Sequence, residues 1–368
     1  MPLLPAFSTT ASRLPLLLMG MVALVSGVLA GFARLAVEVP PLAAAQAGSH
    51  GALMIAGFLG TVIALERAVA LASSGLRWPY LGPLTAGLGG LSLLAGAPAE
   101  LSHALFVSAG LILTAGSALL FFRQPAVYLA ALALAALAWL GGNLVWARDG
   151  ALLPAVPWWI VFLVLTIAGE RLELTRFLPV STVARRIFDL LVAVQLVALP
   201  LGLWREALGL TVLAGALVGL ALWLLHQDIA RRTVKQSGLT RYIAVCLLSG
   251  YAWLAFGAAL GLSGGFVPGD ALRDAALHAI FLGFVFAMIF GHAPIIFPAV
   301  AKVKIPYHPV FYGPLLLLHL TVLARIVGDL ASLPDLAQAA AVGNALTLLL
   351  FVLTVLTRVF FGGKRHAG

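Results

Sequence analysis

Cysteine is almost absent from this sequence. Among 368 residues the only one is Cys246, which lies within an apolar run. A single cysteine excludes an intrachain disulfide, a thiolate metal cluster and covalent haem attachment through a Cys-x-x-Cys-His motif. Any metal or cofactor must therefore be held by other side chains.

Charge is also scarce. Charged residues make up 10% of the chain and hydrophobic residues 62%, which excludes an ordinary soluble domain and is typical of a polytopic membrane protein. The net charge of +9 does not indicate nucleic acid as a partner, because the basic residues lie at the ends of apolar runs, where they orient a membrane protein. Since no long polar linker interrupts the chain, we expect one integral domain, 1–368, in a lipid bilayer.

Apolar runs of spanning length recur along the whole chain and predict an all-α polytopic membrane protein with about twelve transmembrane helices. The first run has no clear small-residue cleavage site, so we expect it to be a retained span rather than a signal peptide. The predicted spans are 14–37, 49–70, 80–97, 102–121, 125–146, 156–175, 186–203, 207–226, 241–263, 271–299, 309–328 and 337–360.

Lysine and arginine are distributed unevenly between the two sides of these spans. Most of the 22 basic residues lie near the N-terminus, in the even-numbered loops and at the C-terminus. This bias predicts an inner-membrane protein with both termini in the cytoplasm. The opposite, outer side has only Arg34, Arg148, Arg205, Arg273 and Arg325.

The stretch HAIFLGFVFAMIFGH in the tenth span is apolar except for its first and last residues, His278 and His292. On a helix these two histidines lie about 40° apart around the axis and roughly 21 Å apart along it. With the predicted topology, His278 and the His50 that opens the second span are both at the outer level of the membrane. His292 is at the inner level.

A short pattern recurs in every fourth span. A phenylalanine is followed, after seven intervening residues, by a polar group, and the three pairs are Phe58 with Glu66, Phe162 with Glu170, and Phe284 with His292. Repeats of this kind are common in membrane folds, and the spacing predicts three four-helix units in the same orientation. Chance is the alternative, because the motif is short and consists of common membrane residues.

His50 and His278 are the first candidate site residues. Two neutral imidazoles from different helices can hold a haem in a six-coordinate, low-spin state, and a membrane haem b is the cofactor that this pair predicts. The alternative is an interfacial histidine bonded to a loop carbonyl. The outer-level arginines Arg34, Arg273 and Arg325 could pair with haem propionates, although Arg273 adjoins Asp274 and Arg325 precedes Asp329 by one turn, so local ion pairs are the alternative.

Other polar groups at membrane depth form a second set of candidates. Glu66, Glu170 and His292 share the inner level, where they could bind a second metal such as copper or relay protons. The alternative for each Glu-Arg neighbour is that it marks the cytoplasmic end of a span. His319 lies in the middle of the eleventh span, and a histidine at that depth is a further candidate ligand.

The stretches HGALMIAGF (50–58), HAIFLGFVFAMIFGH (278–292) and YGPLLLLHLTVLARIVGD (312–329) resemble the NnrS family, and the architecture resembles subunit I of haem–copper oxidases. The oxidase resemblance implies a low-spin haem between histidines of the second and tenth spans, which match His50 and His278. The NnrS resemblance implies association with haem and copper and a role in nitric oxide or nitrosative-stress metabolism.

The sequence departs from the oxidases where they hold copper. It has no histidine in the sixth or seventh span, so a haem–copper oxygen reductase is not expected. The resemblance thus favours a haem protein that engages nitric oxide or transfers electrons to a redox partner. A proton-coupled transporter using Glu66, Glu170 and His292 is the alternative, and a non-catalytic membrane subunit is a third.

Overall fold

The computed structural model describes residues 10–174 and 181–361, and every regular element within them is helical. Eleven of the described helices are long and apolar enough to cross a membrane. The prediction of an all-α polytopic membrane protein is therefore confirmed. Leucine, valine and phenylalanine side chains are exposed along these helices, for example Leu190 on α9 (Thr182–Trp204) and Leu316 on α15 (Tyr312–Leu330), as expected for surfaces in contact with lipid.

The third predicted span, 80–97, differs from the others. Its helix, α5 (Leu81–Leu94), has 14 residues and is about 21 Å long, which is shorter than a bilayer core of about 30 Å. A 3₁₀ turn, Trp78–Tyr80, precedes the helix, and Gly96 follows it with a φ of +64°. That left-handed conformation suits glycine and ends a helix, so the helical part of this run is shorter than the eleven long helices.

The chain divides into two compact units, one comprising residues up to Glu170 with Ala299–Lys302, and the other comprising Arg171–Pro298 with the residues from Val303 onward. The boundary lies inside α8 (Val156–Leu174). This division does not coincide with three four-helix units, which stay a prediction.

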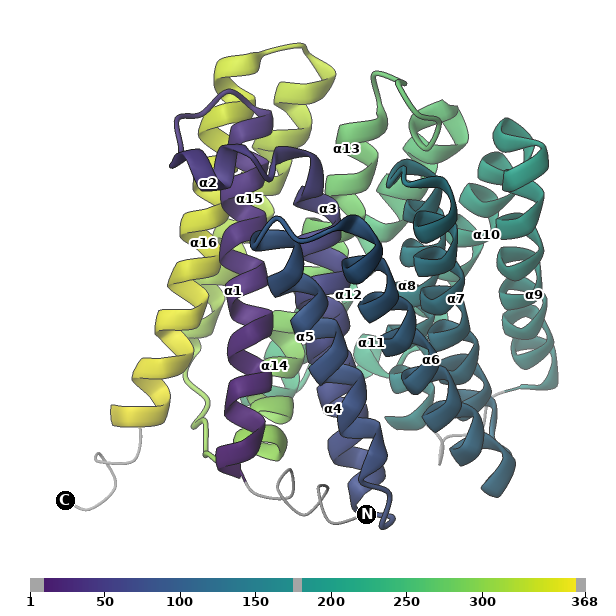
Figure 1. The fold of residues 1–368 in the computed structure, drawn as a ribbon. Helices are drawn as coiled ribbons and strands as arrows, with labels where there is room; N and C mark the ends of the chain where they lie inside the picture. The colour runs from purple at the N-terminus through teal and green to yellow at the C-terminus, as the bar shows by residue number, and fades with distance from the viewer. Residues whose placement is uncertain (1–9, 175–180, 362–368) are drawn as a thin grey trace. The chain divides into compact units, whose positions relative to one another are not determined.

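The first unit contains the helices that surround His50. Helix α1 packs against the second span and against α5, and α5 packs against α6, which in turn packs against α7 (Figure 1). The bounds are α1 Thr10–Arg34, α2 Pro41–Ala44, α3 His50–Ala52, η3 Leu53–Leu59, α4 Gly60–Ala72, α6 Ala99–Arg123 and α7 Val127–Asp149.

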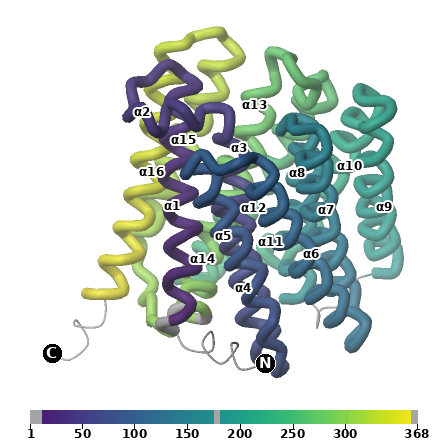
Figure 2. Tube along the Cα trace, viewed as in Figure 1, coloured from purple at the N-terminus to yellow at the C-terminus, as the bar shows by residue number. Residues whose placement is uncertain are grey.

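The second unit contains the helices that surround His278 and His292. Helix α10 packs between α9 and α12, and α15 packs against α16 (Figure 2). The remaining bounds are α10 Glu206–Gln227, α11 Ala230–Thr233, α12 Gly238–Leu260, η6 Gly261–Gly265, α13 Arg273–His278, η7 Ala279–Phe286, α14 Ala287–Ala301 and α16 Pro334–Phe361.

Both helices that carry an outer-level histidine contain a π-helical segment just after it. Residues Leu53–Leu59 follow His50, and Ala279–Phe286 follow His278. Each segment contains a glycine against which a neighbouring helix packs closely: a Cβ at Gly57 would lie 3.0 Å from the Cβ of Ala23, and one at Gly283 would lie 2.5 Å from the ring of Trp253. π-Helical turns are rare and frequently mark functional sites, although a third such segment, Gly261–Gly265, follows no histidine.

The closest helix crossing of the second unit joins α9 to α10. A Cβ at Gly209 would lie 2.3 Å from the backbone nitrogen of Gly202 and 2.9 Å from the carbonyl oxygen of Ala198. Backbone atoms cannot rotate away as a side chain can, so the helices can approach this closely only with glycine at position 209.

We expect Gly209→Ala to destabilise the protein by about 1–3 kcal/mol, the usual range for overpacking. Gly202→Ala is the matched control, because a Cβ there meets nothing within 4 Å. Thermal unfolding of both variants in detergent checks this, and equal melting temperatures for the two would contradict the crossing.

Candidate functional site

His50 lies at the start of the second span, with its ring against α1. Its Nδ1 is 2.7 Å from the carbonyl oxygen of Gly27, and a carbonyl only accepts, so Nδ1 carries the proton and donates. A Cβ at Gly31 would lie 2.9 Å from the same ring. The Gly27-x-x-x-Gly31 groove of α1 thus fixes the plane and the tautomer of His50, with the proton on Nδ1.

His278 ends α13 and has the same tautomer for a different reason. Its Nδ1 donates over 2.8 Å to the backbone carbonyl of Asp274, one turn earlier. The Asp274 carboxylate is also close, with Oδ2 3.3 Å from Nδ1. Asp274 therefore offers the imidazole two acceptors, and Nε2 again has its lone pair available.

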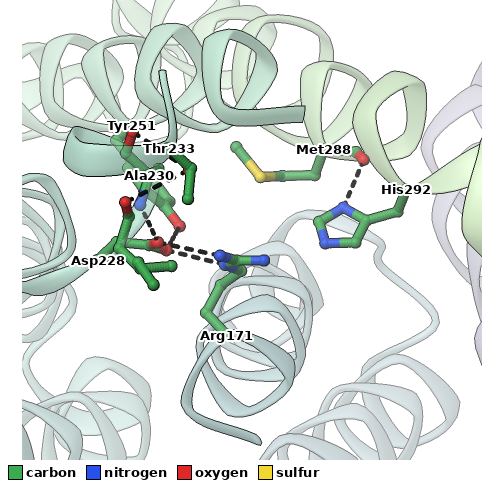
Figure 3. A network of polar contacts seen from close by, with 8 residues as sticks. Arg171, Asp228, Ala230, Thr233, Tyr251, Met288 and His292 are labelled. Atoms are coloured by element: carbon green, nitrogen blue, oxygen red, sulfur yellow. Dashed lines mark hydrogen bonds and ion pairs between the residues drawn. The ribbon is translucent and has the colours of Figure 1, made fainter. Parts of the chain in front are cut away.

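His292, which is buried, repeats this arrangement at the other end of the tenth span. Its Nδ1 lies 2.7 Å from the carbonyl oxygen of Met288 (Figure 3). His278 and His292, the two histidines of the apolar stretch, thus both donate through Nδ1 to the carbonyl of the residue four positions earlier. An imidazole held in this way can bind a metal through Nε2.

His319 has the opposite tautomer. Its Nδ1 accepts a hydrogen bond of 3.0 Å from the indole nitrogen of Trp253, and the two rings stack with centroids 6.5 Å apart. The proton of a neutral His319 is therefore on Nε2. In this tautomer neither ring nitrogen offers a lone pair to a metal, so the geometry does not favour the predicted ligand role of His319.

The three predicted propionate partners differ in what they contact. Arg325 is buried and bonds to the carboxylates of both Asp274 and Asp329, and Arg273 donates to the carbonyl oxygen of Phe266. Arg34 is the exposed last residue of α1, one turn after Gly31. Of the three, Arg34 is thus the arginine best placed for a ligand held at His50.

Glu66 and Glu170, which the repeat placed at one level, do lie near each other. Arg67 is within ion-pair distance of both, with Nη2 3.9 Å from Glu66 and 3.7 Å from Glu170. All three side chains belong to the first unit and are largely buried. The single positive charge of Arg67 is thus shared between two carboxylates.

The second unit contains a buried network that the sequence did not indicate. Arg171 donates from Nε and Nη2 to the two oxygens of Asp228, at 2.8 and 3.0 Å (Figure 3). Asp228 also accepts from the hydroxyl of Tyr251 at 2.6 Å and from the backbone nitrogen of Ala230 at 2.8 Å. This network fixes the loop between α10 and α11 to the end of α8.

The ionisation of Asp228 follows from these contacts. Burial alone would raise the pKa of this carboxyl, but the hydrogen bonds and charge of Arg171, with those of Tyr251 and Ala230, outweigh burial and hold the pKa below its ordinary value. Asp228 is therefore charged at neutral pH, as a bidentate arginine pair requires.

Three features of the site escaped the sequence analysis. The Gly27-x-x-x-Gly31 spacing is a helix-packing signal that could have marked this face of α1 as a contact surface, although not its partner. Asp274, noted only as a neighbour of Arg273, lies four residues before His278 and so on the same helix face. No local signal could have paired Arg171 with Asp228, because 57 residues separate them.

Together these observations define a polytopic helical membrane protein with histidines held by backbone carbonyls near the ends of two spans. The family described as Domain of unknown function (DUF8744) matches residues 13–360, and the chain belongs to that family. No curated protein and no solved structure matches the chain.

We expect Asp228→Asn to destabilise the fold by about 3–5 kcal/mol, because it leaves the buried charge of Arg171 without its partner. Asp149→Asn is the control: it also removes an arginine's carboxylate partner, but the pair that it breaks, with Arg148, is exposed, so its effect should be small. Thermal unfolding in detergent compares the two.

The same pair predicts a dependence of stability on pH. The folded pKa of Asp228 is lower than its unfolded value of about 3.9, so its contribution is complete above that pH and is lost as the pH falls through the folded pKa. Acid should therefore destabilise the wild-type protein more than Asp228→Asn. Parallel stability curves below about pH 4 would contradict this.

Proposed function

We propose that this chain is a haem-binding membrane protein of NnrS type that transfers electrons, with His50 and His278 as axial ligands of a haem b. We further propose that it lies in the inner membrane with both termini in the cytoplasm, as the distribution of basic residues indicates. The proposal draws on the outer-level position of both histidines and on the resemblance of their helices to those of NnrS and oxidase proteins.

The observation that carries the proposal is the protonation of the two imidazoles. Each Nδ1–H donates to a backbone carbonyl, at 2.7 Å for His50 and 2.8 Å for His278. A histidine that ligates a metal through Nε2 almost always donates from its other nitrogen in this way, which fixes the ring and raises its basicity.

The surroundings of each histidine also fit an axial ligand. The ring of His50 lies in a groove of glycines on α1, and Arg34, one turn away, could pair with a propionate. A π-helical segment follows each histidine. When bound, a haem with two histidine ligands supplies one-electron redox chemistry.

The two proposed ligands, His50 and His278, favour one of the two expected activities, electron transfer over the binding of nitric oxide. A haem with two histidine ligands has no open position for a gas, so electron transfer is the activity that this set supports directly. Binding of nitric oxide would require one imidazole to leave. Of the residues proposed for a second metal, His292 supports copper best, because its Nδ1–H is also held by a carbonyl, whereas Glu66 and Glu170 both lie within ion-pair distance of Arg67.

A transporter receives less support. A proton relay needs carboxylates that can take up and release protons, whereas both Glu66 and Glu170 lie within ion-pair distance of Arg67. Proton-coupled uptake in vesicles that Glu66→Gln abolishes would favour transport over the proposed function.

We expect the protein, purified in detergent from haem-replete cells, to show the Soret band of a low-spin haem and to contain one haem per chain. His50→Ala and His278→Ala should each lose the haem or convert it to a five-coordinate form that binds nitric oxide when reduced. Absorption spectra and a pyridine haemochrome assay measure both effects.

His308→Ala is the control for these variants. His308 is exposed on a loop, and its Nδ1 accepts from the backbone nitrogen of Val310, so it has neither the depth nor the tautomer of the proposed ligands. Its variant should keep the wild-type spectrum. A colourless wild-type protein, or a spectrum that neither ligand variant changes, would overturn the proposed function.

The groove on α1 gives a separate prediction. A Cβ at Gly31 would lie 2.9 Å from the His50 ring, so Gly31→Ala should displace the imidazole and weaken haem binding about tenfold or more, as loss of a ligand's support typically does. Gly48→Ala, where a Cβ meets nothing within 4 Å, is the matched control. Haem titration of the apoprotein compares them, and equal affinities would show that the groove does not position His50.

A further inference from the structure

A cluster of three charged side chains lies on the Nδ1 side of His278 in the second unit. Asp274 contributes Oδ2 at 3.3 Å from Nδ1 and forms an ion pair with Arg325. Arg325 projects from α15, is 5% exposed in its side chain, and donates from Nε to Asp329 at 3.1 Å. A continuous chain of polar contacts thus runs from Asp329 through Arg325 and Asp274 to the imidazole.

The cluster has the ligand types of a metal site, since one donor atom from each of Asp274, His278 and Asp329 lies within 4.8 Å of the other two. However, the guanidinium of Arg325 bonds to both carboxylates. A metal ion would have to displace this buried cation, and the arginine would then have no partner for its charge. The geometry favours a hydrogen-bonding role for the cluster.

We propose that Asp274 is a positioning residue that sets the basicity of His278, and that Arg325, held by Asp329, limits the strength of that effect. This inference rests on the proposed function, because it concerns His278 as an axial ligand. A carboxylate near Nδ1–H draws the proton toward itself and makes Nε2 a stronger donor to iron. A stronger donor stabilises oxidised iron more than reduced iron, so the carboxylate lowers the midpoint potential.

The arginine acts in the opposite direction. Its positive charge lies against the same carboxylate and reduces the negative potential that reaches the imidazole. Asp329 partly neutralises Arg325 through its own hydrogen bond to Nε. Without Asp329, the full positive charge of Arg325 would act on Asp274, which should weaken the effect of Asp274 on His278.

The test is a redox titration of the purified haem protein at one pH, followed by absorption. Asp274→Asn should raise the midpoint potential, and Asp329→Asn should raise it by less. The midpoint potential of Asp274→Glu, which restores a carboxylate, should be closer to the wild-type value than that of Asp274→Asn. Asp335→Asn is the control, because Asp335 is an exposed acid at the start of α16 in the same unit, and its loss should leave the potential unchanged.

A second readout separates this role from a structural one. The low-spin ferric signal in electron paramagnetic resonance responds to imidazole basicity, so Asp274→Asn should shift its g values while Asp335→Asn does not. An unchanged potential and unchanged g values in Asp274→Asn would overturn the inference and leave the proposed function standing.

Two other outcomes are also decisive. If Asp274→Asn does not accumulate, Asp329→Asn decides the question, and a wild-type potential in that variant overturns the inference. A wild-type protein without haem overturns the proposed function and the inference together.

Discussion

A polar hydrogen inside a bilayer needs an acceptor from the protein, because hydrocarbon offers none. For the histidines at 50, 278 and 292 that acceptor is a backbone carbonyl, at 2.7, 2.8 and 2.7 Å respectively. The constraint has a chemical consequence: when Nδ1–H is satisfied by the backbone, the lone pair of each ring is on Nε2, the nitrogen that points away from its own carbonyl partner. The same contact that makes a histidine tolerable in the membrane therefore prepares it as a ligand.

The same constraint explains how arginine is accommodated at membrane depth. Arg171, Arg325 and Arg67 each lie against carboxylates rather than toward open solvent. Arg171 and Asp228 form a one-to-one bidentate pair that fixes a loop, whereas Arg325 and Arg67 each lie between two acids. An ion pair with no net charge can hold two segments together without exerting a net electrostatic effect on its neighbours. A cluster with one carboxylate in excess retains negative charge, which can act on a neighbouring group.

The sequence predicted the parts of this architecture that depend on composition and on spacing along one helix. Apolar runs predicted the spans, with one exception, α5, which Gly96 ends early. The spacing of four residues between Asp274 and His278 also predicts that the two side chains share a helix face, although the sequence analysis did not use it. Contacts between distant segments could not be predicted, because nothing local in Gly27, Arg171 or Trp253 shows which helix it packs against. The tautomers of His50 and His319 depend on such contacts, so they could only come from the structure.

The difference between the two proposed ligands follows from these contacts. His50 is supported by a carbonyl in a glycine groove of another helix, whereas His278 is supported by a residue of its own helix that supplies both a carbonyl and a carboxylate. A neutral carbonyl fixes an imidazole but adds little charge, and a carboxylate also strengthens the ligand. The excess negative charge around Asp274 and Asp329 lies on the side of His278 where it would balance the added positive charge of an oxidised iron. On the proposed function, this charge would favour the oxidised state of a haem at His278, and Arg325 would limit the extent of that effect.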